Sequence, residues 1–293
     1  MKEEYHEPVL LNEVLKEIEV LAPLKKKVQV IDATLGTGGH TIKLLESGVQ
    51  VLGIEADPEI LKIAKARLVK FACSQVHGNF VNIDRIAKEN NLEDVDAILF
   101  DLGVSNLQLT DPNRGFSFSN PLAALDMRVD PETQGVTASD LLNVLREDQL
   151  RNMFSKVLDP GSSKWLSQRV LERRAFSPIK TVGDLVEVTR GLKGKGRLNP
   201  ATLPFLAVRI AVNSELENLK EALVKSFEII KKRGKILVIT FHSEEERIVL
   251  DYFKTVEKEK KGRIEGPIKP RYEEVLKNPR SRSAELFTLT KTI

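Results

Sequence analysis

The chain has 293 residues, of which 41% are hydrophobic and 30% are charged, and its formal net charge is +3. This composition supports a folded core and excludes a disordered chain or a histone-like polycation. At roughly 150 residues per domain, the length predicts two domains, or one domain with a large insertion. The single cysteine, Cys73, excludes a disulfide framework and a multi-thiolate metal site, and it predicts a reducing, cytoplasmic location.

The sequence predicts neither export nor membrane insertion. Residues 1–8 contain three glutamates and no apolar stretch of the kind found in signal peptides. No run of about 18 apolar residues is present that would span a bilayer. The four histidines are too dispersed to form a recognisable metal-binding motif, so we expect no metal site.

The first hundred residues alternate between strand-like and helix-like stretches. Short apolar runs predict strands at 28–33, 50–54, 74–77 and 95–100. Single helical patterns separate them, which is typical of βαβ units and a parallel, doubly wound sheet.

The alternation stops after Asp101. Residues 107–200 show a loop and then only helical patterns, 204–230 predicts one long helix, and strand character returns at 235–241 and 286–289. We therefore expect a sheet domain in two parts with a helical substrate-recognition insertion between them. The predicted boundaries are 1–106, 107–200 and 201–293, and we expect loops at 191–200 and 257–270.

A glycine-rich turn follows the first predicted strand and opens a helix. It reads Asp32-Ala-Thr-Leu-Gly36-Thr-Gly38-Gly39-His40. Glycines at such a turn let a ligand approach the backbone, and the helix N-terminus favours an anionic group. Two ligands are candidates for this loop, a dinucleotide and S-adenosylmethionine. The bunched glycines and the preceding acid favour a ligand with an ammonium group, such as S-adenosylmethionine.

Further polar and aromatic residues end the other predicted strands. Glu55 is placed to accept hydrogen bonds from ribose hydroxyls, with Asp57 as a competitor for that role. Phe80 either stacks on a base or belongs to the core. Asp101 and His242 also end strands, at the sheet edge where ligands bind in such folds.

Positive charge is concentrated in two stretches. Residues 164–197 carry a net +6 and residues 254–293 a net +5, which leaves −8 for the rest of the chain. Such segregation favours contacts with phosphates. Phe116 and Phe118 lie in a loop beside Arg114, where they either stack on an unpaired base or fill a domain junction.

Eight motifs spread along the whole chain resemble those of the RsmH (MraW) methyltransferases. The motifs are HEPVLLNEV (6–14), DATLGTGGH (32–40), DLGVSN (101–106), RGFSF (114–118), LDMR (125–128), NPATLPFLAVRIAVNSEL (199–216), TFHSEEERIV (240–249) and NPRSRSAELF (278–287). The resemblance implies a class I methyltransferase fold: an α/β, Rossmann-like, mostly parallel seven-stranded sheet with an inserted helical domain. It also implies methyl transfer from S-adenosylmethionine to the N4 amine of a cytidine in the decoding centre of 16S ribosomal RNA.

The resemblance assigns cofactor contacts to individual residues. They are Gly38, Gly39, His40, Glu55, Phe80, Asp101 and Gln108. The chain departs from the family pattern at Glu55, where aspartate is expected, at Asn106, where serine is common, and at Glu244, where an apolar residue is common. The carboxylate is kept at position 55, so the implied role there is unchanged.

The implied chemistry needs a group that holds or deprotonates the amine. The Asp/Asn/Ser-Pro-Pro-aromatic loop of many amino-methyltransferases is replaced here by Asp101-Leu-Gly-Val. Our candidates are Asp101, Asn106 and His242, in no fixed order. The expected partner is 16S rRNA in the small subunit or its assembly intermediate, and the candidate phosphate contacts are Lys195, Arg197, Arg280 and Arg282. Other interpretations are a protein or small-molecule methyltransferase, a nicotinamide oxidoreductase, and a non-catalytic RNA-binding protein.

Overall fold

The computed structural model describes residues 8–21, 27–92, 94–192 and 199–293. The chain divides into two compact units, and each is described by itself. One comprises Met1–Gly103 with Leu216–Ile293, and the other Val104–Glu215.

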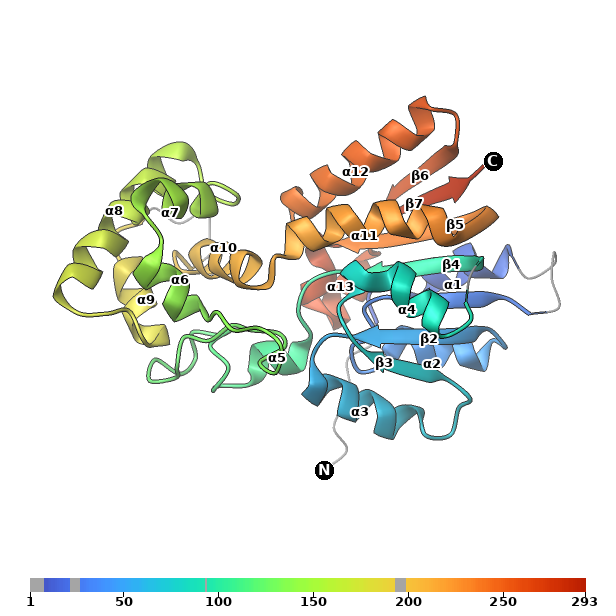
Figure 1. The fold of residues 1–293 in the computed structure, drawn as a ribbon, viewed down its shortest axis with the longest axis horizontal. Coiled ribbons are helices and arrows are strands. Elements are labelled where there is room, and N and C mark those ends of the chain that lie inside the picture. The colour runs from blue at the N-terminus through green and yellow to red at the C-terminus, as the bar shows by residue number, and fades with distance from the viewer. Residues whose placement is uncertain (1–7, 22–26, 93, 193–198) are drawn as a thin grey trace. The chain divides into compact units, whose positions relative to one another are not determined.

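The first unit is built on one seven-stranded sheet with the order β3-β2-β1-β4-β5-β7-β6 (Figure 1). Every neighbouring pair is parallel except the two pairs that β7 makes. This is the mostly parallel, Rossmann-like sheet that the sequence predicts. The strands are β1 (Gln29–Asp32), β2 (Gln50–Glu55), β3 (Ser74–His77), β4 (Val95–Asp101), β5 (Ile230–Thr240), β6 (Gly262–Ile268) and β7 (Glu285–Lys291).

Helices connect these strands and cover the sheet. They are α1 (Leu11–Glu19), α2 (Gly39–Glu46), α3 (Pro58–Leu68), η2 (Phe80–Asn82), α4 (Ile83–Glu89), α11 (Glu215–Ile229), α12 (Ser243–Lys258), α13 (Tyr272–Lys277) and η3 (Pro279–Ser283). Local chemistry sets where they begin. Asp57, for example, accepts hydrogen bonds from the N–H groups of Glu59 and Ile60, and Pro58 occupies the first helical position of α3.

The second unit is helical and has its own core. Its helices are α5 (Asn106–Thr110), α6 (Ala138–Val144), α7 (Glu147–Phe154), α8 (Pro160–Phe176), α9 (Val182–Val188) and α10 (Thr202–Asn213). Fully buried side chains such as Leu150, Phe154 and Leu185 fill its centre. None of the seven strands of the sheet comes from this unit.

The structure corrects two expectations. The long helix expected at 204–230 is two helices, α10 and α11, because Ser214 adopts a left-handed conformation at φ 50°. The loop expected at 257–270 contains β6, an edge strand of which only Gly262 is buried. An edge strand of this kind lacks the apolar alternation by which a strand is recognised in sequence.

The edges of the helical unit also differ from the predicted boundaries. We predicted 107–200, whereas the compact unit spans Val104–Glu215 and therefore includes α10. Residues of α10, such as Phe205 and Val208, belong to the core cluster of this unit. Among the described residues, no helix is both long and apolar enough to cross a membrane.

Candidate active site

The glycine-rich turn between β1 and α2 needs glycine for two different physical reasons. Gly36 and Gly38 have φ values of 54° and 83°, in the left-handed region that side chains disfavour. At Gly39 the constraint is packing, since a Cβ atom would lie 2.7 Å from Cγ of Pro8. Packing against Pro8 therefore accounts for glycine at position 39, independently of the cofactor contact that we predict for this residue.

His40 is the second residue of α2 and is 5% exposed. Its Nε2 lies 3.0 Å from the carbonyl oxygen of Val9 and donates to it, which leaves Nδ1 as the unprotonated nitrogen. Nδ1 is 3.6 Å from Oδ2 of Asp101. Burial lowers the pKa of His40 to about 4, so the ring is neutral at physiological pH and this contact is not an ion pair.

Three acids end three adjacent parallel strands, and of these Asp32 and Glu55 are buried while the Asp101 side chain is 26% exposed. Asp32 ends β1, Glu55 ends β2 and Asp101 ends β4, and β1 lies between the other two strands. Asp32 is paired in register with Gly53 and Leu99, so Glu55 and Asp101 each lie two residues further along their strands. The carboxyl ends of adjacent parallel strands share one edge, which brings these side chains together.

Burial raises the pKa of all three carboxyl groups. The pKa of Asp32 rises to about 6, although its hydrogen bonds with Thr41 and Thr34 act in the opposite direction. Burial raises the pKa of Glu55 to about 7 and that of Asp101 to about 8, with a smaller contribution from the negative charge of Asp32 in both cases. None of the three pairs with a lysine or arginine in the described part of the chain. The cluster therefore favours a cationic ligand.

Glu55 also organises the two loops beside it. Its Oε2 accepts a hydrogen bond from the N–H of Gly36, and its Oε1 accepts one from the N–H of Asp57, both at 2.8 Å. Each oxygen keeps a further lone pair for a ligand hydroxyl. The predicted competitor, Asp57, instead caps α3 with its carboxylate.

Phe80 lies at the carboxyl end of β3, in η2, and is partly exposed. Its ring meets the buried ring of Phe100 edge to face, with 5.6 Å between the centroids. Phe100 thus fixes Phe80 while part of the Phe80 surface stays accessible. Asn79 accepts a hydrogen bond from the N–H of Val81 and so begins this turn.

His242 and Glu245 lie beyond β5, the strand next to β4. His242 is the N-cap of α12, and Glu245 is only 3% exposed. The negative charge of Glu245 contributes to the raised pKa of Asp101. Two buried polar atoms here, Oδ1 of Asp101 and Nε2 of His242, make no hydrogen bond with the rest of the described chain.

Two predicted site residues belong to the helical unit. Asn106 is the first residue of α5, and Gln108 forms a capping box with Ser105 at the same helix. Gln108 accepts a hydrogen bond from the Ser105 N–H at 2.7 Å. Because the two units are described separately, the cofactor role of Gln108 and the catalytic role of Asn106 remain predictions.

The two loop phenylalanines prove to be packing residues of the helical unit. Phe116 is 7% exposed and belongs to its core, with the Arg114 guanidinium 5.4 Å from the ring centroid. Phe118 is 39% exposed and contacts the ring of Phe205 edge to face. Phe116 is therefore not available to stack on a base.

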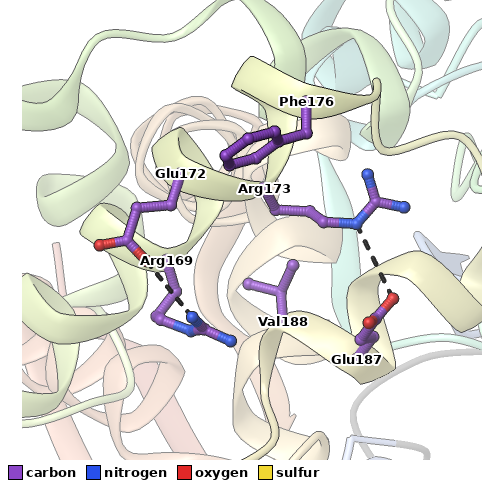
Figure 2. Close-up of a pocket in the computed structure, with 6 residues that line it drawn as sticks. All are labelled: Arg169, Glu172, Arg173, Phe176, Glu187 and Val188. Carbon is purple, nitrogen blue, oxygen red and sulfur yellow. Dashed lines mark hydrogen bonds and ion pairs between the residues drawn. The ribbon is translucent and has the colours of Figure 1, made fainter.

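A hollow on the helical unit lies between α8 and α9 and is framed by ion pairs (Figure 2). Arg169 pairs with Glu172 at 3.3 Å, and Arg173 pairs with Glu187 at 3.7 Å. Two arginines and two glutamates line it, so it carries no excess of positive charge. Lys164, Lys180 and Arg190 make no ion pair with another described residue, and they supply the surplus charge of this segment.

The other predicted RNA contacts divide into two groups. Lys195 and Arg197 lie outside the described residues. Arg280 and Arg282 are exposed on η3 and alternate with buried Ser281, whose hydroxyl donates to the carbonyl oxygen of Asn278 at 2.8 Å. The hydrogen bond of buried Ser281 anchors this turn, and both arginine side chains are exposed to solvent.

Sequence reasoning left two important residues without an assigned role. Asp32 was recognised only as an acid before the glycines, yet it lies at the centre of the acid cluster. Glu245 appears in the sequence only as one residue of the motif TFHSEEERIV (240–249). The signal for it was present, since His242 and Glu245 have the three-residue spacing of a capping box at the start of a helix.

Replacing Asp101 with asparagine is expected to stabilise the ligand-free protein most at pH 9, less at pH 6, and little only near pH 4. The pKa of about 8 in the folded state exceeds the unfolded value of about 3.9, so the folded state binds the extra proton. The wild type should therefore lose stability as the pH rises to about 8, and the variant should lose less.

Thermal melts between pH 6.5 and 9 test this expectation, and each kcal/mol recovered should raise the melting temperature by roughly 2–4 °C. Asp251→Asn serves as the control, because that side chain is 68% exposed. A variant of Asp101 that melts no higher than the wild type at pH 9 would contradict the raised pKa.

Comparison with known proteins identifies the family of the chain. The chain matches the MraW methylase family over residues 3–292. A ribosomal RNA small subunit methyltransferase H from Dictyoglomus thermophilum is 42% identical over 97% of this chain and 96% of its own length. Proteins of the same name from Methylacidiphilum infernorum and Ehrlichia chaffeensis are 41% and 38% identical, over 97% and 98% of this chain and 93% and 99% of theirs. The chain therefore belongs to the MraW methylase family, and it is a methyltransferase.

Proposed function

We propose that this protein methylates small-subunit ribosomal RNA, at the N4 amine of a cytidine in the decoding centre of 16S rRNA. The observation that carries the methyl-transfer part is the acid cluster at the carboxyl ends of β1, β2 and β4, which has no basic partner among the described residues. The RNA part is supported by the names of the relatives, by the motifs and by the segregated positive charge.

The residues of the cluster fit S-adenosylmethionine. When bound, this cofactor supplies an electrophilic methyl group on a positively charged sulfur, and it carries an ammonium group as well. Asp32 and Asp101 offer carboxylates to these positive charges, and Glu55 keeps lone pairs for the ribose hydroxyls. Phe80 offers a partly exposed ring to the adenine, while Gly38 and His40 form the turn on which the cofactor rests.

The substrate amine makes a separate demand. The N4 amine of cytosine is conjugated with its ring and is a poor nucleophile, so the enzyme must orient it and accept the proton that it loses. Oδ1 of Asp101 is a buried oxygen without a hydrogen-bond partner in the described chain, and it lies at the ligand edge of the sheet. A cation bound beside Asp101 lowers the pKa of this carboxyl group and prepares it to accept a hydrogen bond.

The RNA is held by basic residues of both units. Arg280 and Arg282 project from the anchored turn η3 of the sheet unit, and Lys164, Lys180 and Arg190 are unpaired within the described helical unit. Lys195 and Arg197 continue the second set along the sequence. Guanidinium and ammonium groups contact phosphates irrespective of base sequence, so they position the RNA while the pocket selects the base.

Replacing Glu55 with alanine should weaken cofactor binding by roughly 2–3 kcal/mol, because hydrogen bonds to a charged acceptor are lost and two loop N–H groups lose their partner. Calorimetric titration with S-adenosylmethionine measures this. Glu59→Ala on α3 is the matched control, since its side chain is 68% exposed. Equal affinities for the two variants would remove the cofactor from this loop.

Replacing both Arg280 and Arg282 with alanine should lower RNA affinity and flatten its salt dependence by about one to two units of log–log slope. Binding is measured at several salt concentrations, with Arg85→Ala on α4 as an exposed control. The variants should bind S-adenosylmethionine as the wild type does. A lower melting temperature with an unchanged salt slope would show instead that these arginines only stabilise the fold.

The proposed function is tested by methyl transfer from tritiated S-adenosylmethionine to small ribosomal subunits that lack the modification, followed by nucleoside analysis. We expect the label in N4-methylcytidine, and we expect RNase treatment of the substrate to abolish incorporation. Label in another nucleoside would contradict the site of methylation. Label that survives RNase would point to a protein substrate.

A further inference from the structure

Two buried polar atoms at the ligand edge of the sheet lack hydrogen-bond partners in the described chain: Oδ1 of Asp101 and Nε2 of His242. They follow β4 and β5, which are adjacent and parallel. The third such atom, Oγ of Ser226, is on α11 and away from the strand ends. An unsatisfied buried polar atom is costly, and a pair of them at a binding edge indicates the ligand atoms that complete them.

The hydrogen bonds of His242 decide which of its nitrogens carries the proton. Nδ1 accepts from the backbone N–H of Glu245 at 3.4 Å, as in a capping box. Because Nδ1 acts as an acceptor, Nε2 carries a proton and is a donor. Oε1 of Glu245 lies 3.1 Å from Nε2, but the geometry does not make a hydrogen bond, so the donor stays available.

Glu245 holds the segment that carries His242. Its Oε2 accepts hydrogen bonds from the N–H groups of Phe241 and His242, at 2.7 and 3.3 Å. Because Glu245 is 3% exposed and belongs to α12, it ties the end of β5 to the start of that helix. Removing its side chain frees the backbone of His242 and with it the direction of the Nε2–H bond.

Asp101 is fixed in a similar way. Its backbone N–H donates to Oγ1 of Thr34 at 2.6 Å, and Leu102 donates to the carbonyl oxygen of Ile239 at 3.1 Å. These bonds hold the end of β4 between β1 and β5. Asp101 thus presents an acceptor oxygen, and His242 presents a donor, from two neighbouring strand ends.

We propose that Asp101 and His242 read the amine edge of the target cytosine, with Asp101 accepting from the N4 amine, His242 donating to N3, and Glu245 acting as a positioning residue for His242. Cytosine offers a donor at N4 beside an acceptor at N3, which complements this pair. Uracil offers the reverse pattern, with an acceptor at O4 beside a donor at N3, so it is excluded. The inference rests on the proposed function and adds the means of base selection.

The proton balance is simple. A bond forms between N4 and the methyl carbon as the bond between that carbon and sulfur breaks, and the amine loses one proton. Oδ1 of Asp101 takes this proton and passes it to solvent. His242 keeps its proton throughout, because its contribution is to orient and select the base.

The test is a double-mutant cycle that compares two enzymes, wild type and His242→Ala, on two substrates, with and without the N3 atom. Small-subunit RNA is assembled with cytidine or 3-deazacytidine at the target, since 3-deazacytidine replaces N3 with C–H. For the wild type we expect 3-deazacytidine to be methylated about 10–100-fold more slowly. For His242→Ala the two substrates should differ far less, because the variant no longer uses N3. Any intrinsic change in the amine of the analogue affects both enzymes alike and cancels.

Two further comparisons separate positioning from folding. Glu245→Ala should behave as His242→Ala does in the cycle, whereas Glu246→Ala, its neighbour on α12, should keep the wild-type ratio. His77→Ala, which replaces the exposed last residue of β3, should also keep it. If a variant is too slow to assay, the affinities of the two RNAs for the complex with S-adenosylhomocysteine replace the rates.

The outcomes distinguish a failure of the proposed function from a failure of the inference about base selection. A wild type that does not methylate the cytidine substrate contradicts the proposed function and this inference together. A wild type that does so, with the same 3-deazacytidine penalty remaining in His242→Ala, overturns the inference alone. Rescue of the wild-type ratio by Glu245→Gln, which keeps one amide oxygen as an acceptor, would support the positioning role of Glu245.

Discussion

The structure depends most on three carboxyl groups, two buried and one partly exposed, that lie together at one edge of the sheet without a lysine or arginine partner in the described part of the chain. Asp32, Glu55 and Asp101 end adjacent strands, and burial raises the pKa of each above its ordinary value. The neighbouring His40 is neutral and cannot compensate them. Burying acids in this way costs folding free energy, because the ligand-free protein must either protonate them or hold unpaired charge. A positively charged cofactor relieves that cost, so the same arrangement that weakens the free protein creates the binding site.

The surrounding elements hold these acids in place through backbone N–H groups and threonine hydroxyls. Thr41 donates to Asp32, Thr34 accepts from the Asp101 N–H, and Glu55 accepts from the N–H of Gly36. Glu245 fixes the segment before α12 in a similar way, because its carboxylate accepts a hydrogen bond from the N–H of Phe241. Under the proposed function, these oxygen acceptors and N–H donors at the strand ends fix where the cofactor and the target base meet. The protein needs no side chain of opposite charge at this edge, because the cofactor itself carries the positive charge.

The sequence predicts much of this arrangement, because its signals are local. An apolar run that ends in an acid marks each strand of the acid cluster, and Pro58 after Asp57 marks the start of α3. Contacts between distant segments were not predictable. Gly39 packs against Pro8, 31 residues away, and Glu245 influences Asp101 from the first turn of helix α12. The edge strand β6 was missed because its exposed residues lack an alternating pattern, and the break at Ser214 because nothing nearby signals a left-handed residue.

The most direct test of the account is the number of protons exchanged when the cofactor binds. Calorimetric titrations at pH 7.5, in two buffers that differ in ionisation enthalpy, give this number. Since the pKa of Asp101 is about 8 and that of Glu55 about 7 in the free protein, a bound cation should lower both pKa values and release protons. We predict net proton release with S-adenosylmethionine and clearly less with S-adenosylhomocysteine, which lacks the charge on sulfur. Binding of both ligands without proton release would contradict the account.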